Sequence, residues 1–261
     1  MKRHLRVYGT FFRSSFVREL EFRANFIAKI LQNFAWVFFF VMVLVVIYRN
    51  TDSVVGWSRG DAFVLSGACY LMTATCYGCF MSLHEIPQQV RLGTLDFVMT
   101  KPVDSQFWVS TRRFNFDQIG AFVAALGMIG YGVVTGNSQP DGLQWAGFFV
   151  LIACSILLFY SLSLAMMTLG IYFVRVDNLW ALAETVGWVA RYPTDVYGNA
   201  LHRLFTYVLP LTFLAMAPAW QLTHELRPEW IGLGVVWAGL GFLGARWFWR
   251  HSLQSYTSAS S

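Results

Sequence analysis

The length of its uncharged segments most constrains what this chain can fold into. Residues 142–174 run for 33 positions without Asp, Glu, Lys or Arg, and about 20 apolar residues suffice for a helix to cross a bilayer core. Further apolar segments lie at 30–48, 62–83, 119–136, 178–190, 204–223 and 230–249. Only 13% of the residues are charged, against about 25% in a soluble domain. The sequence therefore predicts an all-α membrane protein, with residues 1–261 forming a single transmembrane domain.

The number of spans depends on the segments at 178–190 and 204–223. The first contains Glu184 and runs into Pro193, and the second is interrupted by Pro210 and Pro218; proline disfavours a continuing helix. If every apolar segment crossed the membrane, seven spans would leave the basic ends of the chain on opposite sides. We expect instead six transmembrane helices, with a proline-broken re-entrant segment at 193–223 between spans five and six. The uncharged segment 142–174 is expected to be one long tilted helix.

The distribution of basic residues supports six spans and orients them. With the first residues inside, 14 Lys and Arg lie on the cytoplasmic side and 5 on the other, as the positive-inside rule requires. Both termini and the polar segment 84–113 are therefore expected in the cytoplasm. This orientation also explains the net charge of +5, and we expect no nucleic-acid partner.

Residues 1–29 combine a net charge of +5 with apolar residues at helical spacing, namely Leu5, Tyr8, Phe12, Phe16 and Leu20. This pattern predicts an amphipathic helix on the anionic lipid surface. Two interpretations stay open: a basic anchor that only sets the topology, or an elbow helix that also braces a partner subunit. The scattered charges are unlike those of a cleavable signal peptide.

The polar segment 84–113 lies between spans two and three and has its own helix signals. Pro87 suits a first helical turn, Glu85 precedes it, and Gly93 provides a stop. A second short apolar segment follows at 94–100, and Asp104 offers an N-cap for a helix leading through Trp108 to span three. We expect two short helices that form a compact knob at the cytoplasmic surface. We call residues 84–113 the knob.

Two motifs resemble the bacterial ABC type-2 permeases. The first runs through the knob as Glu85-Ile86-Pro87 and then Val90-Arg91-Leu92-Gly93-Thr94-Leu95-Asp96-Phe97, closing with Lys101-Pro102. The second is Tyr192-Pro193-x-x-x-Tyr197 followed by Leu209-Pro210 and Pro218. Related polysaccharide exporters tend to show asparagine before the proline that corresponds to Pro210. Because this chain has Leu209 there, the resemblance is weaker evidence for a polysaccharide substrate.

The resemblance implies a permease subunit of an ATP-driven exporter working by alternating access. The knob would be the coupling helix, received by a cleft in a separate ABC ATPase subunit present in two copies. Its motif supplies the candidate coupling residues: Glu85, Arg91 and Asp96 for charged contacts, Leu92, Leu95 and Phe97 for packing, and Pro87, Gly93, Lys101 and Pro102. A second permease subunit, this chain itself or a paralogue, would complete the transporter in the inner (plasma) membrane.

The segment 193–223 is the candidate outer gate. Proline-broken helix at membrane depth is tolerated only where it is buried in protein or lines a water-filled cavity. This segment is therefore expected to face a pathway or to cap it on the outer side. The candidate gate residues are Tyr192, Pro193, Tyr197, Pro210 and Pro218.

Two enzymatic motifs are missing from the sequence. There is no G-x-x-x-x-G-K-S/T, and the only lysines are Lys2, Lys29 and Lys101, so a P-loop cannot be formed. The H-E-x-x-H motif of metalloproteases is absent too. Cys76 and Cys79 are interpreted as small helix residues rather than as a metal site. We expect a non-enzymatic subunit without a cofactor, whose ATP is hydrolysed by a partner.

The intramembrane charge Glu184 leaves two alternatives open. An ionisable residue in a span is costly and often functional, but a helix-packing or water-facing position is at least as consistent with the sequence as a substrate contact. A secondary transporter would need an ion or proton relay inside its spans, and Glu184 is almost the only candidate. A non-catalytic membrane scaffold is the other alternative.

Overall fold

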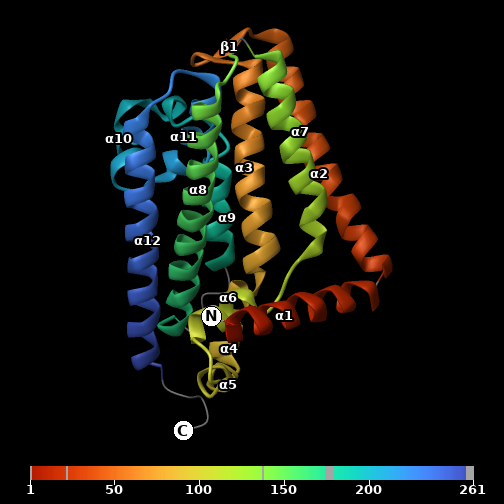
Figure 1. Cartoon of the computed structure of the whole chain (residues 1–261), viewed down its shortest axis with the longest axis vertical. Coiled ribbons are helices and arrows are strands. Elements are labelled where there is room, and N and C mark those ends of the chain that lie inside the picture. The colour runs from red at the N-terminus through yellow and green to blue at the C-terminus, as the bar shows by residue number, and fades with distance from the viewer. Residues whose placement is uncertain (1, 22, 137, 174–178, 257–261) are drawn as a thin grey trace.

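The computed structural model describes residues 2–21, 23–136, 138–173 and 179–256, and they form a helical bundle (Figure 1). Within these residues, five helical stretches are long and apolar enough to cross a membrane. They are α2 (Arg23–Asn50), α3 (Arg59–Phe80) with its continuation to Arg91, α7 (Ile119–Thr135) with the preceding turn, α8 (Gly142–Thr168) continued to Ile171, and α12 (Pro228–Gln254). The all-α, multi-span prediction is confirmed at this level.

The fifth predicted span is present only as a short helix. Segment 178–190 forms α9 (Leu179–Val189), whose 11 residues extend about 16 Å at 1.5 Å per residue. A bilayer core is about 30 Å thick, so α9 alone does not cross it. Residues 174–178, which include Arg175, lie outside the described residues. The long uncharged segment is helical as expected from 142 to 171, through α8 and the 3₁₀ helix η3 (Leu169–Ile171).

The centre of the bundle is α3, which is buried on all faces from Gly60 to Ala74. Its N-terminus is closed by a capping box between Ser58 and Asp61, directly after a two-stranded hairpin of β1 (Ser53–Val54) and β2 (Trp57–Ser58). Along the bundle α3 packs chiefly on α7, and α12 packs chiefly on α8. An apolar helix without a polar face belongs in such an interior.

Glycines allow the backbones of α3 and α7 to touch. A Cβ built on Gly60 would lie 2.7 Å from the Gly136 Cα, and one on Gly132 would lie 2.6 Å from the Gly60 carbonyl oxygen. Any larger residue at Gly132 would force the two helices apart. Small residues serve this purpose in membrane helix pairs.

Helix α1 (Lys2–Glu21) lies across the base of the bundle (Figure 1). The spanning helix α2 begins at Arg23 rather than at residue 30, so the expected boundary at 29 is displaced by about two turns of helix. Ser15 Oγ accepts a hydrogen bond from the Phe114 N–H at 3.1 Å, and the Phe12 ring meets the Phe114 and Phe116 rings edge-on. Helix α1 is thus attached to the segment that enters α7.

The knob contains the short helices that the sequence predicts. After the 3₁₀ helix η1 (Met81–Glu85) come α4 (Ile86–Arg91), α5 (Asp96–Met99) and α6 (Ser105–Thr111). Gly93 has φ +66°, the left-handed conformation that ends a helix, and Asp104 accepts from the Phe107 N–H as the N-cap. The expected continuous helix from Asp104 into span three is wrong, because α6 ends at Thr111 and the turn η2 (Phe116–Gln118) precedes α7.

The proline-rich segment 193–223 is broken into four short pieces, as expected. They are η4 (Thr194–Tyr197), α10 (Gly198–Tyr207), η5 (Leu211–Leu214) and α11 (Met216–Thr223). Figure 1 places α10 and α11 in the half of the bundle nearer β1, away from the knob. Pro193 and Pro210 precede 3₁₀ turns. Pro218 does not break the chain, since it lies in the first turn of α11, where no helical hydrogen bond is lost.

Candidate functional site

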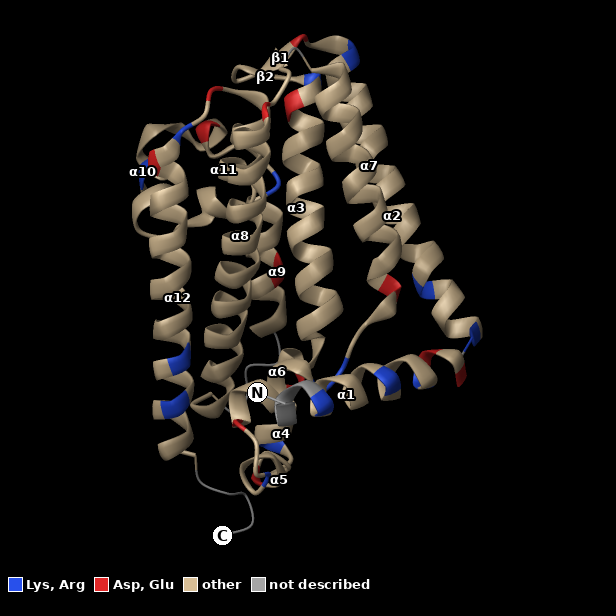
Figure 2. Ribbon diagram, viewed as in Figure 1, with Lys and Arg blue, Asp and Glu red and all other residues tan. Residues whose placement is uncertain are grey.

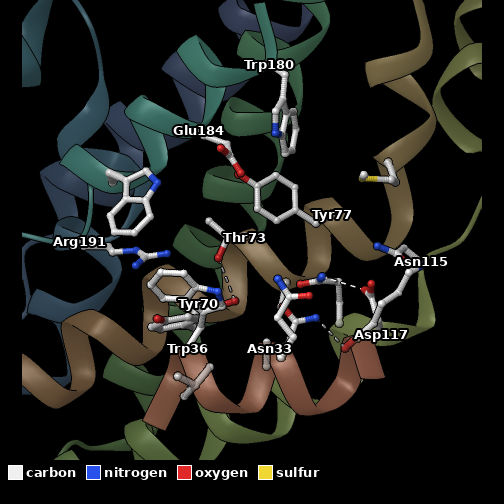
Figure 3. Close-up of a pocket in the computed structure, with 18 residues that line it drawn as sticks. Asn33, Trp36, Tyr70, Thr73, Tyr77, Asn115, Asp117, Trp180, Glu184 and Arg191 are labelled. Atoms are coloured by element: carbon white, nitrogen blue, oxygen red, sulfur yellow. Dashed lines mark hydrogen bonds between the residues drawn. The ribbon is translucent and has the colours of Figure 1, made fainter. Parts of the chain in front are cut away.

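A recess of about 560 Å³ opens between α2, α3, α9 and residues 115–118 (Figure 3). Its wall combines aromatic rings with carboxamides and four charged side chains, Lys29, Asp117, Glu184 and Arg191. Such a mixture is unusual in this bundle, where charged residues otherwise gather on α1, on α12 and near the ends (Figure 2). Concave sites with a few convergent polar groups are the usual form of ligand pockets.

Arg191 forms the first charged position in the recess. Its guanidinium carbon lies 4.2 Å from the Trp188 ring centroid, 4.9 Å from that of Tyr70 and 5.5 Å from that of Phe40. A guanidinium within about 6 Å of a ring face is attracted by the ring's quadrupole. Three aromatic rings thus surround this cation, which follows α9 directly.

Glu184 forms the second charged position, two turns earlier on α9. Figure 3 shows its side chain directed toward Tyr77 and beside Trp180. The ring centroids of Tyr77 and Trp180 are 5.1 Å apart. Among the described residues, no basic side chain forms an ion pair with Glu184. Within the described ranges, a half-buried carboxylate is therefore set against aromatic rings without an ion pair.

Amide groups line the other side of the recess. Asn33 donates from Nδ2 to the backbone oxygen of Asp117 at 3.2 Å, and Gln118 donates from Nε2 to the Asp117 carboxylate at 2.8 Å. These bonds join α2 to the turn before α7. Sequence reasoning selected only Glu184 from this recess. The other lining residues come from separate helices, and no local pattern marks them.

The five candidate gate residues lie outside the described lining of the recess. Tyr192 is exposed and Pro193 is buried, while the Tyr197 hydroxyl donates to the Val189 carbonyl at 3.4 Å. Pro210 lines a separate apolar groove between α8, α12 and η5. The structure therefore separates the candidate gate from the candidate binding recess.

Buried hydroxyls hold the candidate gate together. Thr212 is fully buried, and its Oγ1 lies 3.2 Å from that of Thr194 and 2.9 Å from that of Thr206. Thr194 is also 3.0 Å from His202 Nδ1. This threonine cluster, Thr194, Thr206 and Thr212, ties η4, α10 and η5 to one another through hydroxyl groups, and His202 Nδ1 also lies 3.1 Å from the Asp195 carboxylate beside it.

The knob separates into a buried face and an exposed tip. Leu95 is fully buried in the chain's own core, so the expectation that it packs into a partner's cleft does not fit its position. Leu92 is 62% exposed and Phe97 69%, as expected for packing residues. Arg91, Lys101 and Pro102 are also exposed, and Gly93 and Asp96 are half-buried. Pro87 packs on the backbone of Gly170, where an added Cβ would lie 2.9 Å from the proline ring.

Glu85 is occupied inside the chain. It forms ion pairs with Arg112 and Arg113, which closes the knob at its base. Burial, followed by the charge of Arg113, lowers the pKa of Arg112. A contact between Glu85 and a partner subunit would have to compete with these two guanidinium groups.

A second set of polar contacts fastens α6 to the bundle. The Asp104 carboxylate accepts from Arg246 at 3.0 Å, and the buried Gln106 bridges Arg246 at 2.8 Å and the Tyr160 hydroxyl at 3.0 Å. Burial alone would raise the pKa of Asp104, but the Phe107 N–H and Arg246 outweigh it and hold this pKa below its usual value. These contacts connect α6 to Tyr160 on α8 and to Arg246 on α12.

Comparison with known proteins decides the family. A family profile described as ABC-2 family transporter protein matches residues 34–260, which is most of the chain. The chain belongs to the ABC-2 transporter family. Searches of curated proteins and of solved structures find no match. This ABC-2 protein is thus a multi-pass membrane permease, and permeases of its family normally work with an ABC ATPase.

Proposed function

We propose that this ABC-2 protein is the permease subunit of an ATP-driven exporter, coupled to two copies of a separate ATPase through the tip of its knob. The single observation that carries the proposal is the exposed apolar surface of Leu92, Phe97 and Met99, with exposed fractions of 62%, 69% and 44%. They lie on a segment at the end of the molecule opposite β1 (Figure 1). Exposed apolar clusters of this kind mark contact surfaces.

The positions of the charges support a cytoplasmic knob in the inner membrane. Helix α1, the knob and the basic end of α12 lie at the same end of the bundle (Figure 2). The positive-inside rule assigns that end, with both chain termini, to the cytoplasm. The ATPase and its nucleotide are available there, and α1 then acts as an elbow helix at the lipid surface.

The proposed mechanism is alternating access. Closure of the two ATPase copies on ATP draws the paired knobs together. Each knob transmits the displacement to α3 through Glu85 and to α8 and α12 through Asp104, Gln106 and Arg246. The recess beside α9 then changes its access, and α10 and α11 form the outer gate. A second permease, either this chain or a paralogue, completes the pathway.

Replacing Leu92 and Phe97 together by Asp tests the coupling surface. The tagged protein is purified from its own host's membranes, and the amount of co-purified ATPase is measured. Loss of two apolar anchors at about 1 kcal/mol or more each lowers ATPase retention by about tenfold or more. Thermal unfolding of the purified permease stays unchanged, because both side chains are exposed.

Val55→Asp is the matched control, since Val55 is an exposed apolar residue in the β1–β2 turn at the other end of the molecule. It should leave ATPase retention at the wild-type level. Equal retention by wild type and by the Leu92/Phe97 variant would contradict the proposed coupling surface. If the wild type itself retains no ATPase, the secondary-transporter and scaffold alternatives are favoured.

A further inference from the structure

The recess beside α9 contains two aromatic settings of similar construction. In one, the Arg191 cation lies among the rings of Phe40, Tyr70 and Trp188 at 5.5, 4.9 and 4.2 Å. In the other, Tyr77 and Trp180 flank Glu184. The first setting already holds an organic cation that the chain supplies. The second has the rings and, in addition, a carboxylate.

We propose that the second setting binds a lipophilic organic cation: a quaternary or protonated amine, or a phosphonium, with an apolar body. The inference rests on the proposed function in one respect, namely that the bound cation is the exported substrate. The cationic centre lies against Glu184 and beside the contacting rings of Tyr77 and Trp180, and the apolar body occupies the remaining space toward Trp36.

Electrostatics favours this ligand over an anion or a neutral molecule. A carboxylate at membrane depth is costly unless it is compensated, and in the described part of the chain no ion pair neutralises Glu184. An aromatic face adds an attraction for a desolvated cation that it does not offer to an anion. Lys29 and Arg191 line the same recess, but neither of these two described residues forms an ion pair with Glu184. A bound cation would contact the Glu184 carboxylate directly and replace the charge compensation that these two side chains supply from a distance.

The shape of the recess selects a lipophilic cation rather than a small inorganic one. Its volume of about 560 Å³ accommodates a molecule of drug size. Trp36 and Trp188, which are 57% and 50% exposed, contribute broad apolar walls. Small inorganic cations require several oxygen ligands, and no group of three or more metal-binding side chains occurs within the described ranges.

The test compares two ions of the same shape and opposite charge, tetraphenylphosphonium and tetraphenylborate. Binding of each is measured by equilibrium dialysis of the purified chain in neutral detergent, corrected with micelles that contain no protein. We expect saturable binding of the phosphonium. Glu184→Gln lowers its affinity by about tenfold or more, because the substitution removes the charge but keeps the side-chain size. The same substitution does not weaken tetraphenylborate binding.

Two further comparisons separate recognition from damage to the fold. Glu225→Gln removes an exposed carboxylate outside the recess and should leave phosphonium affinity unchanged. Trp180→Leu should weaken binding, whereas Trp180→Phe, which keeps an aromatic face, should retain more of it. If Glu184→Gln destabilises the protein, the phosphonium affinities of Trp180→Leu and Trp180→Phe still test the site.

Equal phosphonium affinity in wild type and Glu184→Gln would overturn the inference, and so would preferential binding of tetraphenylborate. The assay uses no ATPase, so its result is independent of the coupling experiment. Retained ATPase with no phosphonium binding would leave the permease role standing and reject the substrate class. Phosphonium binding without ATPase retention would support the site and count against the exporter.

Discussion

The two ends of this permease are held together by different forces. At the knob end, charged groups make the connections: Glu85 pairs with Arg112 and Arg113, and Asp104 pairs with Arg246. At the other end, the threonine cluster of Thr194, Thr206 and Thr212 uses neutral hydroxyls, with a single His202–Asp195 contact beside it among the described residues. Ion pairs at partly exposed positions are screened by salt and compete with new partners. Buried neutral hydrogen bonds have neither property.

The difference fits the separate tasks proposed for the two ends. A coupling region must change its contacts when a partner changes state, and half-exposed ion pairs can be exchanged at modest cost. An outer gate must stay closed against water until a large displacement opens it. The comparison predicts that substitutions at one end leave the other end unaffected.

The largest effect is expected from Arg246→Met at the knob end. The substitution removes the partner of Asp104 and of the buried Gln106, and hydrogen bonds to charged groups contribute about 1.5–3 kcal/mol each. We expect the free energy of unfolding to fall by about 2–3 kcal/mol. Chemical denaturation in detergent micelles measures it. Hydrogen exchange should accelerate in α6 and not in α10; acceleration in both would contradict independent ends.

Thr212→Val should have a smaller effect, at the other end. Valine keeps the shape of threonine but removes the hydroxyl that lies 3.2 and 2.9 Å from those of Thr194 and Thr206. Leaving these buried groups without this partner costs about 1–2 kcal/mol, measured by the same denaturation. Hydrogen exchange should accelerate in α10 and η5 only. Added salt should leave this difference unchanged, whereas it should reduce the difference caused by Arg246→Met.

The smallest effect is a pH dependence confined to the knob end. Because the pKa of Asp104 is lowered in the fold, its ionised form stabilises the native state fully above the unfolded value of about 3.9. This contribution is lost as the pH falls through the lower native pKa. The protection factors of the α6 amides, which are corrected for the pH dependence of intrinsic exchange, should therefore fall below about pH 4. Asp104→Asn should remove that acid-induced change, and an unaltered pH profile in this variant would assign it to another group.

Much of the fold was predictable because its signals are local. Helix α8 follows from an uncharged segment, α4 from Pro87 and Gly93, and the start of α6 from Asp104 as an N-cap. Each rule concerns residues within a few turns of one another. The errors arose where tertiary contacts took over: α6 ends at Thr111 and gives way to the non-helical segment that carries Arg113, a partner of Glu85.

The sequence by itself determined the multi-span helical architecture, the broken segment before α12 and the knob with its helix signals. Only the tertiary structure decided which residues meet. It brings Glu184 to Tyr77 and Trp180, and it joins Asp104 to Arg246 across 142 positions of the chain. Periodicity and capping depend on neighbouring residues and so can be read from the chain. The rotation of each helix about its axis depends on packing against helices distant in sequence, and that rotation decides whether a charge faces lipid, solvent or the recess.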